Sequence, residues 1–295
     1  MLSFIFFTVA CALACNADPI APLQGSFNKY FIYSRQFSRD PVELDATNIW
    51  ASADVLSLEN NTTIIVHGHK GSGTTTLNPI LKDAALESED MNVIVVDWSV
   101  YASQSYNNAV GAVSIVGTAL AQVIQELVRQ SAVTLDTLHL IGFDLGAHVV
   151  GFTGRALDGE VARITGLNPS GREWGTHSPR LNSNDALYVE VIHTDAVGLL
   201  AYGVGDAIGD VNFYPNGGTG QPGCFLNNYC SHNRAWELMA ASLTHNLLIG
   251  NKCGNWPQVK LNTCSGYLLR MGNNDHIKLG SGMFRVNTRT KYPFA

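Results

Sequence analysis

Short runs of apolar and β-branched residues alternate along this chain with stretches whose apolar residues recur at helical spacing. Six runs predict strands, at residues 29–35, 62–68, 92–98, 137–143, 161–167 and 187–194, and three intervening stretches predict helices, at 77–87, 109–129 and 146–157. Nearly continuous apolarity marks strands that are buried on both faces, as in a parallel sheet. The alternation therefore predicts an α/β fold, with a mostly parallel central sheet flanked by helices. The tail, residues 259–295, predicts edge strands and turns that close one side of this sheet.

The composition fits one globular domain whose main partner is not a polyanion. The chain has 295 residues, of which 46% are hydrophobic and 14% are charged, so it can bury a large core. We find no internal repeat and no linker rich in Pro or Ser. The formal net charge is -6 and the basic residues are scattered, which argues against nucleic acid or an anionic membrane surface as a partner. We expect a small neutral or apolar ligand instead.

The first residues predict export from the cell. Residues 1–17 form an apolar run that ends in small residues and is too short to span a bilayer. We therefore expect a cleaved signal peptide, no transmembrane anchor and an extracellular protein, with residues 18–295 as the mature domain. Asn60 and Asn61 begin two overlapping sequons, which is consistent with glycosylation of a surface loop.

Four cysteines remain after this cleavage, an even number that predicts two disulfides in an oxidising compartment. They are Cys224, Cys230, Cys253 and Cys264, and three pairings are possible. The pairs 224 with 230 and 253 with 264 are favoured, because each closes a short loop. A zinc site is the rival interpretation, but the spacing is not C-x-x-C and a secreted context disfavours it.

Residues 138–155, LHLIGFDLGAHVVGFTGR, predict a strand, a sharp turn and a helix. Gly142 and Gly146 bracket the turn as in the G-x-S-x-G nucleophile elbow, but Asp144 stands at its centre in place of serine. The segments HGHKGSG, GFDLG, GLNPSG and HTDAVG each follow a predicted strand. Function in parallel sheets gathers at the carboxyl ends of the strands, so we expect these loops to meet around the turn. His193, within a predicted strand, is interpreted as a hydrogen-bonded core histidine.

These motifs resemble the neutral (pancreatic-type) lipase family, in its branch of insect secreted lipases, phospholipases A1 and yolk proteins. IVHGHKGSG, NVIVVDWS, ARITGLNP, VEVIHTD, FYPNGG, QPGC and CSH follow in the order of the family, and the likeness covers the mature chain. The resemblance implies an α/β-hydrolase fold without a second, C-terminal lipid-binding domain. Residues 225–229 resemble the shortened lid of phospholipases A1, so we do not expect interfacial activation. Phe143 stands where the family usually has histidine.

Position by position, the resemblance implies an altered catalytic triad. Asp144 takes the place of the nucleophile, Asn168 that of the acid and His232 that of the base, while the backbone N–H groups of His69 and Leu145 take the oxyanion-hole positions. We expect the Asp144 carboxylate to lie against those N–H groups and to repel a substrate oxyanion. An acid-to-amide change in a serine protease costs ~10⁴ in rate. His232 is interpreted as ion-paired with Asp144, which favours its charged form.

We therefore expect a secreted pseudoenzyme that binds a lipid, another apolar ligand or a protein partner and uses no cofactor. Insect yolk proteins, which resemble lipases and lack the nucleophile, are a precedent. The alternative is an enzyme, either a carboxylic ester hydrolase of the lipase or phospholipase A1 type or a hydrolase whose Asp144 attacks a saturated carbon. For the latter, Asp195 is the candidate acid behind His232. A metal site at His67, His69 and Asp144 is disfavoured, because the resemblance places His67 in a metal-free oxyanion loop.

Overall fold

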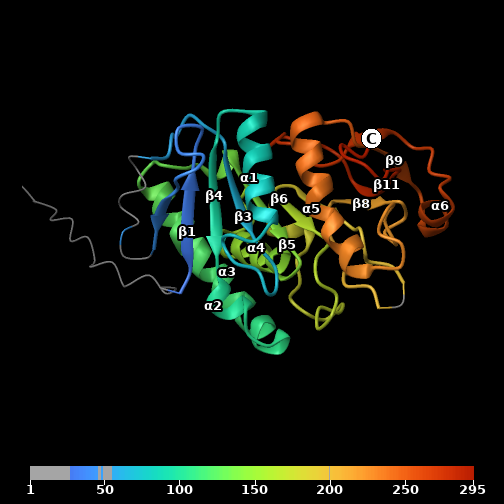
Figure 1. Ribbon diagram of the computed structural model, residues 1–295, viewed down its shortest axis with the longest axis horizontal. Coiled ribbons are helices and arrows are strands. Elements are labelled where there is room, and N and C mark those ends of the chain that lie inside the picture. Colours follow the sequence, from blue (N-terminus) through green and yellow to red (C-terminus); the bar gives the residue numbers. More distant parts are fainter. Residues whose placement is uncertain (1–26, 46–47, 49–54, 199) are drawn as a thin grey trace, which may run out of the picture.

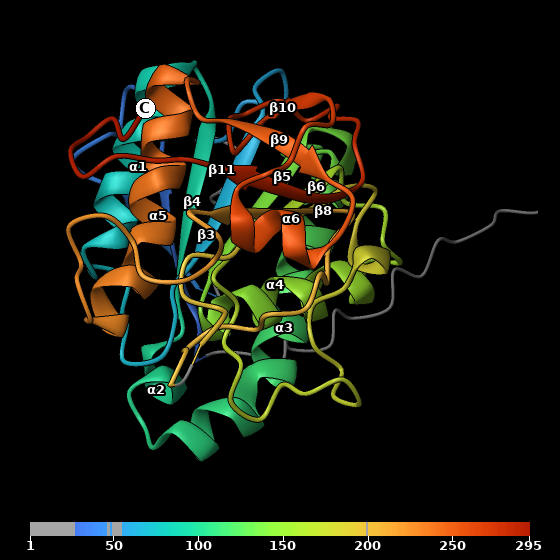
Figure 2. The same ribbon diagram turned by 90° about the vertical axis from the view of Figure 1, so that its right-hand side faces the viewer.

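The computed structural model describes residues 27–45, 48, 55–198 and 200–295, and the expected signal peptide lies outside these residues. The described residues form an eleven-stranded sheet with helices on both faces (Figures 1 and 2). The strands are β1 Lys29–Tyr33, β2 Val42–Leu44, β3 Thr62–Val66, β4 Asn92–Asp97, β5 Leu138–Phe143, β6 Arg163–Leu167, β7 Val189–Ile192, β8 Val211–Pro215, β9 Ile249–Cys253, β10 Leu268–Arg270 and β11 Gly282–Val286. The helices are α1 Leu77–Ser88, α2 Ser99–Ala102, α3 Tyr106–Arg129, α4 Leu145–Ala156, α5 Asn228–His245 and α6 Trp256–Leu261, with 3₁₀ helices η2 Leu135–Thr137 and η3 Ser183–Asp185.

The central strands run parallel, in the order β4, β3, β5, β6, β7, β8 and β11. Antiparallel strands complete the sheet, with β1 and β2 beyond β4 and with β9 and β10 beyond β11. Val66 lies opposite Gly142, which lies opposite Gly166, so β3, β5 and β6 end at nearly the same level. The loops that follow them therefore meet at one edge. This architecture confirms the expected α/β-hydrolase fold.

The core lies in two layers, one on each face of the sheet. Ile64 of β3 packs in a cluster with Leu120 of α3, whereas its neighbour Ile65 packs in a second cluster with Leu81 of α1. Successive strand residues point to opposite faces, so a strand covered on both sides must be apolar throughout. Figure 2 shows α1 and α5 on one side of the sheet and α3 and α4 on the other.

Helix α3 is long and apolar enough, by length and composition, to cross a bilayer. However, 61% of its most apolar window is buried inside the fold, where Val113, Val116 and Leu120 contribute to the core. This burial gives α3 the character of a core helix.

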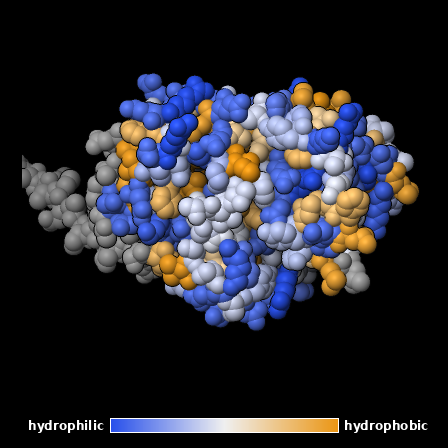
Figure 3. Space-filling model, in the orientation of Figure 1, coloured by the Kyte–Doolittle hydropathy of each residue, from blue (hydrophilic) through white to orange (hydrophobic). Residues whose placement is uncertain are grey.

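On the face of the molecule drawn in Figure 3, hydrophobic and hydrophilic residues are interspersed.

All six predicted strands are present, as β1, β3, β4, β5, β6 and β7, and the three predicted helices correspond to α1, α3 and α4. Helix α3 begins three residues earlier than predicted, because the Ser105 hydroxyl caps it by accepting the Asn108 N–H. The prediction of edge strands for the tail holds for β10 but is wrong for β11, which lies between β8 and β9 and pairs with β8 in parallel. Strand β8 and helix α5 were not predicted.

Two disulfides fix the carboxyl-terminal third. Cys224 pairs with Cys230, and Cys253 pairs with Cys264, which is the favoured pairing. The first disulfide closes the loop that precedes the triad-like histidine of α5, so it constrains one wall of the site described next. The zinc alternative is excluded for these cysteines, since all four sulfurs are bonded in pairs.

Candidate functional site

The turn between β5 and α4 is a nucleophile elbow in its backbone, although aspartate lies at its tip. Asp144 has φ 54° and ψ −118°, a conformation that is costly for an L-residue and is held by its surroundings. A Cβ atom on Gly142 would lie 2.2 Å from the Gly146 carbonyl oxygen, and one on Gly146 would lie 2.3 Å from that of Val66. Both positions therefore require glycine for the helix to approach the sheet.

The Asp144 carboxylate contacts one of the backbone donors that were assigned to the oxyanion hole. Its Oδ2 accepts the backbone N–H of His69 at 2.9 Å, and the residue is only 8% exposed. Its Oδ1 lies 3.6 Å from Nε2 of His232. Leu145, the other expected donor, begins α4, where backbone N–H groups have no intrahelical acceptor. A carboxylate oxygen thus takes one of the two N–H groups that a substrate oxyanion would need.

Asn168, which follows β6, contacts the imidazole of His232 through its amide nitrogen. The backbone N–H groups of Thr194 and Asp195 both donate to Asn168 Oδ1, each at 2.9 Å. These two donors fix which end of the amide is the oxygen, so Nδ2 is the atom that lies 2.6 Å from His232 Nδ1. An amide N–H can only donate, and Nδ1 must accept. The proton of the neutral ring is therefore on Nε2, the tautomer opposite to that of a catalytic triad.

His232 lies in a mostly apolar environment on α5. Burial lowers its pKa below the usual 6.5, and the nearby Asp144 carboxylate only partly opposes this effect. The Phe143 ring lies 4.5 Å away between centroids and the Tyr202 ring 5.3 Å away. The expected pairing of Asp144 with His232 is present at 3.6 Å, but burial, which disfavours the cation, has a larger effect on the pKa of His232 than the carboxylate.

Asp195 lies close to this arrangement but does not contact His232. Its carboxylate accepts the Tyr202 N–H and the side-chain amide of Asn228, while its backbone N–H donates to Asn168. The expectation that Asp195 is the acid behind His232 is wrong, because the Asn168 amide already contacts Nδ1, the ring nitrogen with which that acid would interact.

The other histidines near the elbow have structural partners. His67 Nε2 accepts the Trp98 N–H, and His69 Nε2 lies 3.0 Å from the Gln104 carbonyl oxygen. His193 is buried and hydrogen-bonds the Val204 carbonyl, as interpreted from the sequence. Within the described residues, no group of three His, Cys, Asp or Glu side chains is arranged to hold a metal ion.

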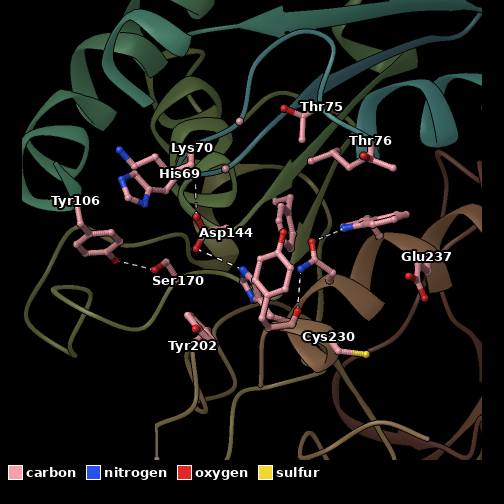
Figure 4. A pocket seen from close by; sticks show the side chains of 18 of the residues that line it. His69, Lys70, Thr75, Thr76, Tyr106, Asp144, Ser170, Tyr202, Cys230 and Glu237 are labelled. Carbon is pink, nitrogen blue, oxygen red and sulfur yellow. Dashed lines mark hydrogen bonds and ion pairs between the residues drawn. The ribbon is translucent and has the colours of Figure 1, made fainter. Parts of the chain in front are cut away.

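A cavity of about 820 Å³ opens over the Asp144 carboxylate (Figure 4). Its walls are mostly apolar and come from the loops after β3 and β6, from residues 201–202 and from the start of α5. In the loop closed by the first disulfide, Phe225 and Leu226 are almost fully exposed, so this short segment does not cover the opening. Tyr106 and Trp236 also line the cavity, and neither was identified from the sequence. Both residues lie on helices, outside the loops expected to form the site, and no sequence motif marks them as cavity residues.

Comparison with known proteins identifies several lipases to which this chain is similar. Lipase member H-B of Xenopus laevis is 37% identical over 224 residues, which are 71% of this chain and 47% of that protein. Lipase member H of Oryctolagus cuniculus is 37% identical over 83% of this chain and 58% of its own length, and pancreatic lipase-related protein 2 of Cavia porcellus is 30% identical over 80% and 56%. The chain spans about half the length of these curated relatives. The profile of the family described as Lipase matches residues 43–289, and the chain belongs to this lipase family.

Proposed function

We propose that this chain is a secreted, lipase-fold binding protein that holds an apolar ligand or lipid in the cavity over Asp144 and does not run serine-hydrolase turnover. The observation that carries the proposal is the hydrogen bond from the His69 N–H to Asp144 Oδ2, at 2.9 Å. In an acyl-transfer enzyme, this donor would stabilise the oxyanion of the tetrahedral intermediate. Here the side chain of Asp144 holds this donor.

The other two triad positions support the same conclusion. Asn168 forces Nδ1 of His232 to accept, so Nε2 carries the proton and cannot take one from a nucleophile or a water. Attack of the Asp144 carboxylate on an ester would form an acid anhydride and expel an alkoxide, which is energetically unfavourable. The cavity itself is retained, and at about 820 Å³ it has the size of small-molecule sites.

Export and branch membership belong to the proposal as well. Two disulfides are typical of an oxidising compartment. In the sequon at Asn61, the side-chain amide donates to Glu89, so we propose Asn60 as the better glycan acceptor of the two. The short disulfide-closed loop at residues 225–229 supports placement among the insect lipases, phospholipases A1 and yolk proteins. A protein partner is the alternative occupant of the cavity.

The test restores the triad in the mature protein. We expect the double variant Asp144→Ser, Asn168→Asp to hydrolyse short esters at least ~10³-fold faster than the natural protein, because both a nucleophile and a correctly oriented base return. The single variant Asp144→Ser is the matched control and should stay close to the rate of the natural protein, since its imidazole keeps the wrong tautomer. Ester or phospholipid hydrolysis by the natural protein at the rate of the double variant would overturn the proposal.

The second candidate function, attack of Asp144 on a saturated carbon, is favoured only by the proximity of Asp144 and His232. Its hydrolytic step needs an imidazole that accepts a proton from water at Nε2, and the Asn168 contact opposes this. Incubation with alkyl halides or epoxides in ¹⁸O-labelled water distinguishes the two functions. Appearance of ¹⁸O in the Asp144 carboxylate with product release supports the second, and its absence disposes of it.

A further inference from the structure

One oxygen of the buried Asp144 carboxylate has no hydrogen-bond donor among the described residues. Oδ2 accepts the His69 N–H, whereas His232 Nε2 lies 3.6 Å from Oδ1, beyond hydrogen-bond range. A carboxylate offers about four lone-pair directions. Asp144 lines the cavity, so at least one of these directions faces the space where a ligand binds.

No lysine or arginine is ion-paired with this carboxylate within the described residues. The Asn168 amide donates to Nδ1 of His232 and burial lowers the pKa of this ring, so both effects favour its neutral form. Lys70 donates its ammonium to the Ser103 carbonyl, and Arg172 lies over the Tyr106 ring, 5.1 Å from its centroid. By contrast, the other carboxylate that lines the cavity, Glu237, is ion-paired with Arg234 at 2.6 Å. The carboxylate of Asp144 thus differs from that of Glu237 in having no lysine or arginine partner among the described residues.

Aromatic rings surround the space above this anion. They are Tyr106, Phe143, Tyr202, Tyr229 and Trp236, and all five line the same cavity. In Figure 4, Tyr106 lies to the left of Asp144 and Tyr202 lies below it. Ring faces attract cations, and such attraction is strongest where water is excluded.

We infer that the cavity selects an apolar amine, whose protonated head binds Asp144 Oδ1 among the aromatic rings and whose hydrocarbon part fills the rest of the cavity. An ammonium group supplies both the missing donors and the missing charge. An alcohol supplies a donor without charge, an ester supplies neither, and a fatty-acid carboxylate is repelled. The inference rests on the proposed binding function and adds the chemical class of the ligand to it.

The experiment compares three probes with the same ten-carbon chain, decylammonium, decanol and decanoate, by equilibrium dialysis against the mature protein at pH 7. Charge-assisted hydrogen bonds are roughly twice as strong as neutral ones, and cation–π contacts add to them, so we expect decylammonium to bind about tenfold or more tightly than decanol. Decanoate should bind most weakly. Equal binding of decanol and decylammonium overturns the inference and leaves the binding function standing, whereas no binding of any probe overturns both.

Two pairs of variants assign the preference to the site. Asp144→Asn removes the charge at nearly constant shape and should abolish the preference for decylammonium without weakening decanol binding. Asp136→Asn makes the same change at an exposed carboxylate outside the cavity and should leave all three affinities unchanged. Tyr229 is 67% exposed, so Tyr229→Leu keeps the fold, and it should weaken decylammonium binding several-fold more than decanol binding, whereas Tyr229→Phe should not. A preference that survives Asp144→Asn contradicts the inference.

Discussion

Replacing Asn168 by aspartate should reverse the tautomer of His232 and raise its pKa. In the natural protein the Asn168 amide donates to Nδ1 across 2.6 Å, and burial holds the pKa of His232 below 6.5. An aspartate can keep one oxygen on the Thr194 and Asp195 N–H groups while the other accepts from Nδ1. A carboxylate at such a distance typically raises the pKa of a histidine by about 1 to 3 pH units, or about 1.4 to 4 kcal/mol.

The assay is a pair of two-bond ¹H–¹⁵N correlation spectra of histidine-labelled protein, recorded over a pH series, with His232 assigned from the signals lost in His232→Gln. We expect Nε2–H in the natural protein and Nδ1–H in Asn168→Asp. His148 is an internal reference for the first tautomer, because its Nδ1 accepts the Leu181 N–H and its Nε2 lies 2.8 Å from the Ser170 carbonyl. A natural protein with Nδ1 protonated, or a variant whose His232 pKa does not rise, would refute the reasoning.

Two further predictions concern stability. Gly142→Ala should lower the free energy of unfolding by about 2 to 3 kcal/mol, because its methyl group would lie 2.2 Å from the Gly146 carbonyl oxygen. Gly111→Ala, in open space on α3, should raise the free energy of unfolding by about 0.5 to 1 kcal/mol, since alanine favours a helix more than glycine does. Urea unfolding of both variants measures the difference. Burial lowers the pKa of His148 to about 4, so between pH 6.5 and 4 the unfolded chain binds a proton that the folded chain does not. The free energy of unfolding should therefore fall by roughly 3 kcal/mol from this residue as the pH falls through that window, and His148→Gln should flatten the slope measured in urea; an unchanged slope would contradict the assignment.

The parallel part of the fold was predictable from the sequence because strands buried on both faces consist almost entirely of apolar residues. The residues of β3, β4 and β5 are nearly all apolar, since the helices cover both faces of these strands. Helix α5 has no such signal. It mixes Asn, Ser and Arg with its apolar residues, and tertiary contacts with α1 hold it in place. Strand β11 was misplaced because its parallel pairing with β8 joins segments that are far apart in the sequence.

The identities of the residues in the site followed from the motifs, but their electrostatics did not. The turn at GFDLG is a local property of the sequence, and Asn168 and His232 lie in motifs that can be recognised along the chain. The charge state of His232 depends on how deeply α5 buries the ring, which no short segment specifies. Likewise, Asp195 follows a strand end as a triad acid would, and only the three-dimensional arrangement shows that its carboxylate binds Tyr202 and Asn228 instead.

The central claim is that the natural site does not catalyse ester hydrolysis, and the most direct measurement compares natural protein with His232→Ala. Both are assayed as mature proteins on short esters, long esters and phospholipids. We predict equal rates within about twofold, at the level of the buffer background, because an imidazole with Nε2 protonated contributes no base catalysis. A natural rate that His232→Ala lowers by ~10²-fold or more would contradict the claim and identify the chain as an active hydrolase.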